Sequence, residues 1–277
     1  MKQYPAIDVR TDVPDLLLAF VDDFGPTAVE ERGAAVRVFF STPADRDDAR
    51  LALATSFEVT AVDVPDEDWA RRSQENLAPV TVGRITVFPN PQSPADHPSL
   101  GKPHSVTRDT IDIVIVPSMG FGTGHHVTTR LCLAALQTIN LTNRLVLDVG
   151  TGSGVLAIAA DRLGAARAIG IDYDEDAIQS ARENLDLNPE ARHVTLDAID
   201  LAARELPLVD IVTANLTGGL LVRSAATLLA AVRPGGTLIL SGIQSHERDE
   251  VRHAFAEAAV CWELDEDGWV GLAMKKP

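Results

Sequence analysis

Two adjacent histidines lie in the glycine-bracketed stretch "FGTGHHVTT", residues 121–129, and a pair of threonines follows them. Histidine titrates near neutral pH and binds metal ions, so His125 and His126 are candidates for a general base or for metal ligands. Adjacent histidines are awkward as ligands to one ion, and no cluster of Cys, Asp or Glu stands beside them in the sequence. We therefore expect no metal site. The preferred interpretation is a loop that packs over a bound ligand and is ordered by a histidine.

A second stretch, "VLDVGTGSG" at residues 146–154, alternates glycine with other residues after an apolar run. This pattern predicts a strand, a glycine loop and a helix beginning near Val155, because glycine lets the backbone turn sharply and approach a ligand closely. The dinucleotide fingerprint would need glycine at position 155, and no phosphate-binding lysine follows. Gly150 and Gly152 are therefore candidates for backbone contacts to a nucleotide-like ligand without a pyrophosphate.

Three polar side chains lie at the ends of strands that we predict after this loop. Asp172 comes 22 residues after Gly150, where an acid can accept hydrogen bonds from both hydroxyls of a ribose. Asp197 could accept a hydrogen bond from an adenine amino group, and Asn215 one from a target amine or from the cofactor. Each also suits a structural role, as a solvated strand end or a turn residue. A ribose-binding acid without pyrophosphate spacing indicates an adenosine cofactor without phosphates, and S-adenosylmethionine fits.

The composition indicates a cytoplasmic protein with a sizeable core. Hydrophobic residues make up 45% of the 277, while no apolar run approaches the length of a membrane span and no signal peptide opens the chain. We therefore expect no membrane partner. The formal net charge of -16 argues against direct binding of nucleic acid and is compatible with a basic protein partner, although acidity alone also keeps a protein in solution.

The elements that must position these residues suggest two domains. The first 64 residues follow the order strand, helix, two strands, helix, strand, which is the split βαβ pattern of ferredoxin-like domains. We assign residues 1–64 to an N-terminal domain and residues 65–110, which include a Pro-rich connection, to a linker. Apolar strands then alternate with helices, which predicts a doubly wound parallel α/β sheet over residues 111–277. Two final strands joined at Asp267-Gly268 would add an antiparallel strand at its edge.

Five stretches carry a resemblance to a known family and cover roughly residues 115–245. They are "FGTGHHVTT", "VLDVGTGSGVLAIAA", "GIDYDEDAIQSARENLDLN", "VTANL" and "LSGI". In this order they resemble the class I S-adenosylmethionine-dependent methyltransferases of ribosomal protein L11. The chain departs from the family pattern after Asn215, where "NLTGGLL" replaces the commoner "NI" followed by a small residue and proline.

The resemblance implies a seven-stranded Rossmann-like methyltransferase domain behind a small α+β ferredoxin-like domain that recognises the substrate. It also implies that "FGTGHHVTT" contributes Phe121, Thr123 and Thr129 to the cofactor site, with the Thr129 hydroxyl at the amino-acid end of S-adenosylmethionine. Thr129 would also suit the N-cap of the following helix. The residues expected at the reacting atoms are Asn215 and His126.

The expected activity is S-adenosylmethionine-dependent N-methylation of lysine or N-terminal amines of ribosomal protein L11, a basic substrate. The alternatives are a methyltransferase for another protein or small molecule, and a silent cofactor-binding partner protein. The reaction is an in-line displacement at a sulfonium, for which positioning carries much of the catalysis, so no general base is required by the sequence. A chain truncated near Pro89 should still bind the cofactor, because every expected cofactor residue follows Met119.

Overall fold

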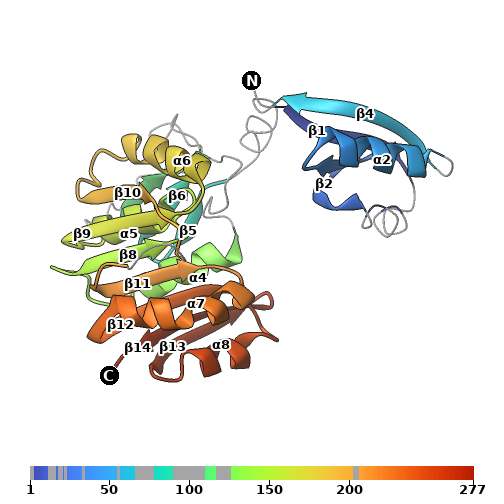
Figure 1. The fold of residues 1–277 in the computed structure, drawn as a ribbon. Coiled ribbons are helices and arrows are strands. Elements are labelled where there is room, and N and C mark those ends of the chain that lie inside the picture. The colour runs from blue at the N-terminus through green and yellow to red at the C-terminus, as the bar shows by residue number, and fades with distance from the viewer. Residues whose placement is uncertain are drawn as a thin grey trace. The chain divides into compact units, whose positions relative to one another are not determined.

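The structure is a computed structural model, and it describes residues 3–11, 17, 21, 24–32, 35–54, 57–65, 78–89, 110–116, 126–201 and 206–277. The chain divides into two compact units, residues 1–76 and 77–277 (Figure 1). Among the described residues, no helix is long and apolar enough to cross a membrane.

The N-terminal unit contains a four-stranded antiparallel sheet and helix α2 (Pro43–Leu53). Its strands are β1 (Gln3–Arg10), β2 (Pro26–Arg32), β3 (Ala35–Phe40) and β4 (Glu58–Pro65). The order β2-β3-β1-β4 is that of a ferredoxin-like sheet, as the pattern of elements predicts. Helix α2 begins where expected, because the Thr42 side chain accepts a hydrogen bond from the backbone N–H of Asp45 at 3.2 Å. The helix predicted between β1 and β2 lies almost entirely outside the described residues.

The C-terminal unit is built on a seven-stranded sheet in the order β10-β9-β8-β11-β12-β14-β13. The strands are β8 (Leu145–Val149), β9 (Arg167–Asp172), β10 (Val194–Ala198), β11 (Val209–Asn215), β12 (Val232–Gln244), β13 (Ala259–Glu266) and β14 (Trp269–Lys275). Strands β8 to β12 are parallel and β14 joins β12 antiparallel, so the predicted doubly wound sheet with a terminal hairpin is confirmed. The hairpin turns at Asp267 and Gly268, both with positive φ.

Helices cover both faces of this sheet (Figure 1). They are α4 (Val127–Leu136), α5 (Val155–Arg162), α6 (Glu175–Asp186), α7 (Gly218–Ala231) and α8 (Arg248–Ala254). Neighbouring residues of β8 enter opposite cores: Val146 packs in the cluster that contains residues of α4 and α5, and Leu147 in the one that contains residues of α7 and α8. Both faces of the central strand are therefore buried, which explains its continuous apolar sequence.

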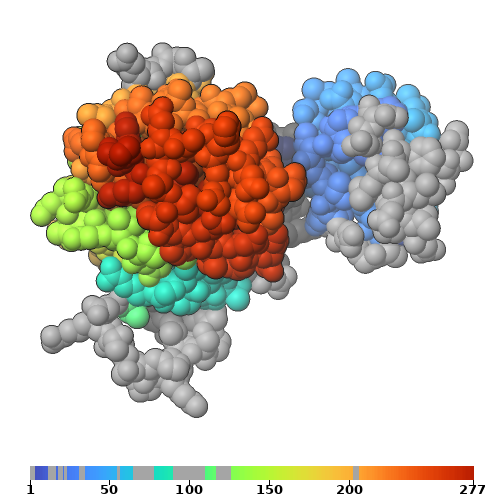
Figure 2. All heavy atoms as spheres, turned by 90° about the horizontal axis from the view of Figure 1, so that it is seen from below, coloured from blue at the N-terminus to red at the C-terminus, as the bar shows by residue number. Residues whose placement is uncertain are grey.

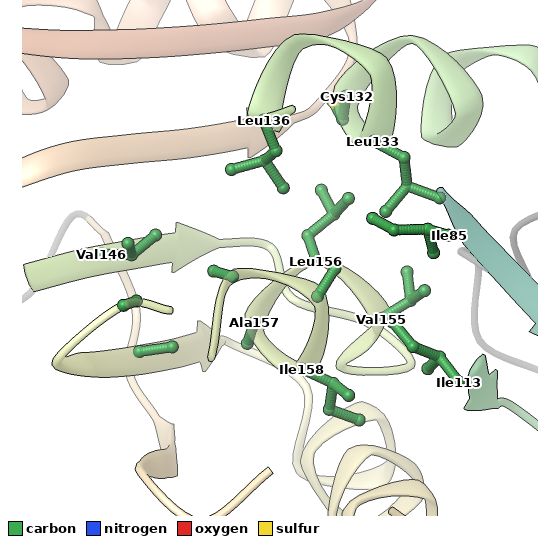
Figure 3. Close-up of a cluster of buried hydrophobic side chains, with 14 of the residues drawn as sticks. Ile85, Ile113, Cys132, Leu133, Leu136, Val146, Val155, Leu156, Ala157 and Ile158 are labelled. Atoms are coloured by element: carbon green, nitrogen blue, oxygen red, sulfur yellow. The ribbon is translucent and has the colours of Figure 1, made fainter. Parts of the chain in front are cut away.

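A third sheet, in the order β5-β6-β7, also belongs to the C-terminal unit. It consists of β5 (Val80–Val82), β6 (Ile85–Phe88) and β7 (Ile111–Val114), and β6 pairs with β7 in parallel. Ile85 and Ile113 are fully buried against Val155 and Leu156 of α5 (Figure 3), and the teal atoms of β5 and β6 lie against the rest of the unit in Figure 2. The predicted linker therefore includes a segment that forms strands.

This sheet changes the expectation for a truncated chain. A chain that begins near Pro89 would lack β5 and β6, and with them the buried side chains of Ile85 and Val87. Losing two fully buried aliphatic side chains costs several kcal/mol, because each contributes about 1.5–3 kcal/mol through burial. A truncated chain that retains the core must begin near residue 77.

Candidate functional site

The glycine loop between β8 and α5 has the backbone geometry that only glycine adopts easily. Gly150, Gly152 and Gly154 have φ values of 68°, 52° and 82°. A Cβ at Gly150 would lie 2.5 Å from the Leu216 side chain, and a Cβ at Gly154 would lie 3.2 Å from Ala181 of α6. Larger residues would therefore be strained in conformation, and one at Gly150 would also require the Leu216 side chain to move.

Asp172, the last residue of β9, is fixed against this loop. Its Oδ2 accepts a hydrogen bond from the Gly152 N–H at 3.0 Å, and its Oδ1 accepts one from the Asp174 N–H at 3.2 Å. The Thr151 N–H donates to the Ile171 carbonyl at 2.9 Å, which ties the loop to β9 a second time. The carboxylate is thus held in place by backbone donors before any ligand is bound.

A buried acid, Asp148, lies under the same loop at the end of β8. Its two oxygens accept hydrogen bonds from the hydroxyls of Thr151 and Thr213, each at 2.6 Å. Burial raises the pKa of Asp148 to about 6, since the two threonine hydrogen bonds only partly offset the loss of water and the nearby charge of Asp172 raises it further. The loop therefore rests on a group that titrates just below neutral pH.

Helix α4 carries the other side of the site. His126 is its N-cap: Nδ1 accepts from the Thr128 N–H at 3.3 Å and lies 2.8 Å from the Thr128 hydroxyl. The helix begins about one turn earlier than an N-cap at Thr129 would require, so the prediction of Thr129 as an N-cap is wrong. Thr129 lies in the first turn of the helix and is fully buried. The Asn215 side chain donates from Nδ2 to the Thr129 hydroxyl at 3.4 Å.

One cavity of about 950 Å³ joins these parts. Of the residues predicted from the sequence, the structure brings six to its wall: His126, Thr129, Gly150, Gly152, Asp172 and Asn215. Asp197 does not line it; the wall is formed instead by the residues that follow β10, Ile199, Asp200 and Leu201. Phe121 and Thr123 lie outside the described residues.

Trp269 is one of the wall residues that the sequence interpretation missed. Its ring meets the His126 ring edge to face, with centroids 5.1 Å apart and planes at 74°, and both rings line the cavity. A signal was present: an antiparallel strand after the Asp267-Gly268 turn must begin at the edge where the parallel strands end. Trp269 pairs there with Gln244, the last residue of β12.

Gly242, in the "LSGI" stretch, shapes the same wall. It has a φ of 83°, and any Cβ there would overlap the backbone carbonyl of Leu216. The Leu216 N–H donates to the Ser241 carbonyl at 3.0 Å, so β12 holds the backbone that follows Asn215. No group of three or more His, Cys, Asp or Glu side chains within the described ranges is placed to hold a metal ion.

Comparisons with known proteins agree on one family. A sequence profile described as "Ribosomal protein L11 methyltransferase (PrmA)" matches residues 26–277. Ribosomal protein L11 methyltransferases from Pseudomonas aeruginosa and Pelobacter propionicus are 35% and 33% identical, and the matches cover 93% and 97% of this chain and 85% and 96% of theirs. A solved ribosomal protein L11 methylase from Lactobacillus delbrueckii subsp. bulgaricus aligns with a TM-score of 0.64 at 26% identity, over 73% of this chain and all of that one.

Proposed function

Because this chain belongs to the family of S-adenosylmethionine-dependent ribosomal protein L11 methyltransferases, we propose that it methylates amines of ribosomal protein L11. The observation that supports this most directly is the convergence of the glycine loop, Asp172 and Asn215 on one cavity. The cavity volume of about 950 Å³ lies at the upper end of the range typical of small-molecule sites, about 300–1,000 Å³. Such a volume suits a cofactor together with part of a substrate.

The residues fit S-adenosylmethionine. The backbone of Gly150 and Gly152 would approach it closely, the Asp172 carboxylate would accept hydrogen bonds from its ribose, and the Thr129 hydroxyl would face its amino-acid end. Asp200, which lines the cavity just after β10, replaces Asp197 as the acid that would lie beside the adenine. When bound, this cofactor supplies a methyl group activated by a sulfonium.

The protein's task is then to present an amine in line with that methyl group. Because Asn215 Nδ2 donates to Thr129, its Oδ1 is the amide atom left to accept a hydrogen bond from the target amine. In this proposal His126 positions the start of α4 and does not act as a general base. Its Nδ1 accepts the hydrogen bond from the Thr128 N–H, and a proton taken up at Nδ1 would abolish that bond. Trp269 offers an aromatic face that stabilises a methylated ammonium product by a cation–π interaction.

The amine must lose a proton before it attacks, because an ordinary lysine has a pKa of about 10.4. Entry into a partly apolar cavity lowers that pKa by desolvation. The Asn215 oxygen then orients the neutral amine by accepting a hydrogen bond from one of its two N–H groups. This arrangement assigns no general base, and it explains catalysis through alignment of the reacting atoms.

Substrate recognition falls to the N-terminal unit in this proposal. Residues 1–64 contain 12 Asp and Glu against 6 Lys and Arg, which suits a basic protein partner and not a nucleic acid or an anionic membrane. The reaction would take place in the cytoplasm, because the proposed substrate is a ribosomal protein. A truncated chain beginning at residue 77 should keep its affinity for S-adenosylmethionine and methylate ribosomal protein L11 far more slowly; equal rates would contradict a recognition role.

The experiment that tests the function is incubation with labelled S-adenosylmethionine and total ribosomal protein. Label on ribosomal protein L11, lost in an Asn215→Ala variant that still binds the cofactor, is the expected result. Label on another protein would identify a different substrate. Cofactor binding without any labelled product would leave a silent cofactor-binding protein.

A further inference from the structure

Two asparagines on helix α6 and just beyond its end are buried next to the site and have every side-chain polar atom engaged. Asn184 is 1% exposed and Asn188 is 2% exposed. Asn184 donates from Nδ2 to the Ser153 carbonyl at 3.0 Å and accepts at Oδ1 from the Val116 N–H at 2.9 Å. Asn188 accepts from the Val114 N–H at 2.9 Å and donates from Nδ2 at 2.7 Å to the carbonyls of Val114 and Asn184.

The two asparagine side chains make hydrogen bonds to the backbone of β7 of the kind that a neighbouring strand would make. Among the strands that the structure describes, β7 has only β6 beside it and is an edge of its sheet. Asn188 pairs with both the N–H and the carbonyl of Val114, and Asn184 pairs with the N–H of Val116 just beyond the strand. The two side chains therefore satisfy backbone groups that an edge strand otherwise leaves unpaired.

Asn184 alone also reaches the glycine loop. Ser153 stands between Gly152 and Gly154, which both have positive φ and whose backbones are intrinsically free to rotate. The hydrogen bond from Asn184 fixes the carbonyl between them, and Ala181, one turn earlier on the same face of α6, packs against Gly154. One face of α6 thus connects the loop to the end of β7.

We propose that Asn184 is a positioning residue for cofactor binding: it holds the glycine loop in its ligand-ready conformation, whereas Asn188 anchors β7 and the Asn184 backbone carbonyl. This inference rests on the proposed cofactor site. The physical reason is preorganisation. If the loop had to be ordered on binding, the conformational entropy lost in ordering it would lower the affinity for the ligand. Asn188 provides a matched control, because it has the same residue type and burial and lies four residues further along the chain. Its side-chain hydrogen bonds go to the Val114 backbone and the Asn184 carbonyl, and none of them goes to the loop.

The test compares Asn184→Asp with Asn188→Asp, using S-adenosylhomocysteine in calorimetry at pH 8 and urea unfolding of each full-length variant. Each carboxylate keeps its backbone acceptor role and loses the donor. We expect Asn184→Asp to weaken binding about 5- to 10-fold, the factor that one neutral hydrogen bond contributes, and Asn188→Asp to change it less than about 2-fold. Both variants should lose stability.

A pH series separates this role from general loosening of the core. Protonation of the carboxylate introduced by Asn184→Asp restores a donor to the Ser153 carbonyl, so the affinity gap to the wild type should narrow as the pH falls. Asn184→Ala leaves space for a water and allows the affinity at position 184 to be compared with that at position 188 without an introduced charge. It replaces Asn184→Asp if that variant does not fold. Equal affinity losses at positions 184 and 188, or none at 184, would overturn the inference. Failure of the wild type to bind S-adenosylhomocysteine would instead overturn the proposed cofactor site.

Discussion

Replacing Asp172 with alanine should lower the affinities for S-adenosylmethionine and S-adenosylhomocysteine by the same factor. The carboxylate is held by the N–H groups of Gly152 and Asp174 at 3.0 and 3.2 Å, so it is preorganised to accept further hydrogen bonds from a ribose. A hydrogen bond to a charged group contributes about 1.5–3 kcal/mol, which corresponds to a loss of about 10- to 150-fold in affinity. The ribose is identical in the two ligands, which is why the factor should be shared.

An alternative is that Asp172 acts only through its negative charge, by attracting the sulfonium. The two explanations differ in their ligand dependence, because S-adenosylhomocysteine lacks the sulfonium charge. A purely electrostatic role would weaken binding of S-adenosylmethionine more than binding of S-adenosylhomocysteine. It would also predict a comparable loss for Asp174→Asn, since Asp174 lines the same cavity.

Asp174→Asn is a suitable control, because Asp174 is the N-cap of α6 and asparagine caps helices equally well. Calorimetry with both ligands should be carried out on the wild type, Asp172→Ala and Asp174→Asn, with circular dichroism to establish that each is folded. The expected result is an equal loss for both ligands in Asp172→Ala and little change in Asp174→Asn. Unchanged affinity in a folded Asp172→Ala protein would refute the ribose assignment.

Three further predictions concern the walls of the cavity. Thr129→Val keeps the shape of the side chain and removes the hydroxyl that accepts from Asn215, so calorimetry should show S-adenosylmethionine binding about 10-fold more weakly; full affinity would argue against a cofactor role for this hydroxyl. Trp269→Leu should weaken binding of the methylated product form of ribosomal protein L11 by about 2- to 30-fold, the range of a cation–π contact, with Trp269→Phe in between and cofactor affinity unchanged in both. A parallel loss of cofactor affinity would place Trp269 in the cofactor site. Asp148→Asn should remove a pH-dependent contribution to the free energy of unfolding. The pKa of Asp148 is raised from 3.8 to about 6 in the folded protein, so this group stabilises the wild type below pH 4, and that stabilisation is lost as the pH rises through 6. The wild type should therefore become less stable relative to Asp148→Asn by about 3 kcal/mol between pH 4 and pH 7, measured by urea unfolding, and a pH-independent difference would contradict the raised pKa.

The parts of the site that are predictable are those encoded by local patterns. Glycines at 150, 152 and 154 follow directly from a strand and precede a helix, and all three have the positive φ that gives glycine its advantage. The parallel sheet, and with it the carboxyl edge that holds Asp172 and Asn215, follows from the alternation of apolar strands with helices. The ferredoxin-like order of the first sheet likewise follows from the sequence of elements alone.

The parts that are not predictable depend on contacts between distant segments. Strands β5 and β6 contain only 3 and 4 residues, and β6 finds its parallel partner β7 more than 20 residues later, across a Pro-rich stretch. A local pattern therefore does not distinguish their apolar residues from those of a linker. Asp197 illustrates a finer limit, because a strand end predicts which edge of the sheet a residue approaches but not which residue of the following loop reaches the cavity.

The departure "NLTGGLL" from the family pattern also has a local physical explanation. The backbone after Asn215 is fixed from the β12 side, by the hydrogen bond from Leu216 to Ser241 and by the close approach of Gly242. The residues after Leu216 determine how α7 begins, and Thr217 and Leu220 among them also line the cavity. A Cβ at Gly218 would lie 2.6 Å from the carboxyl group of Glu247, so glycine leaves room for an acid at the positive end of the helix. Asn215 therefore keeps its place at the cavity wall while the start of the helix after it is built from different residues.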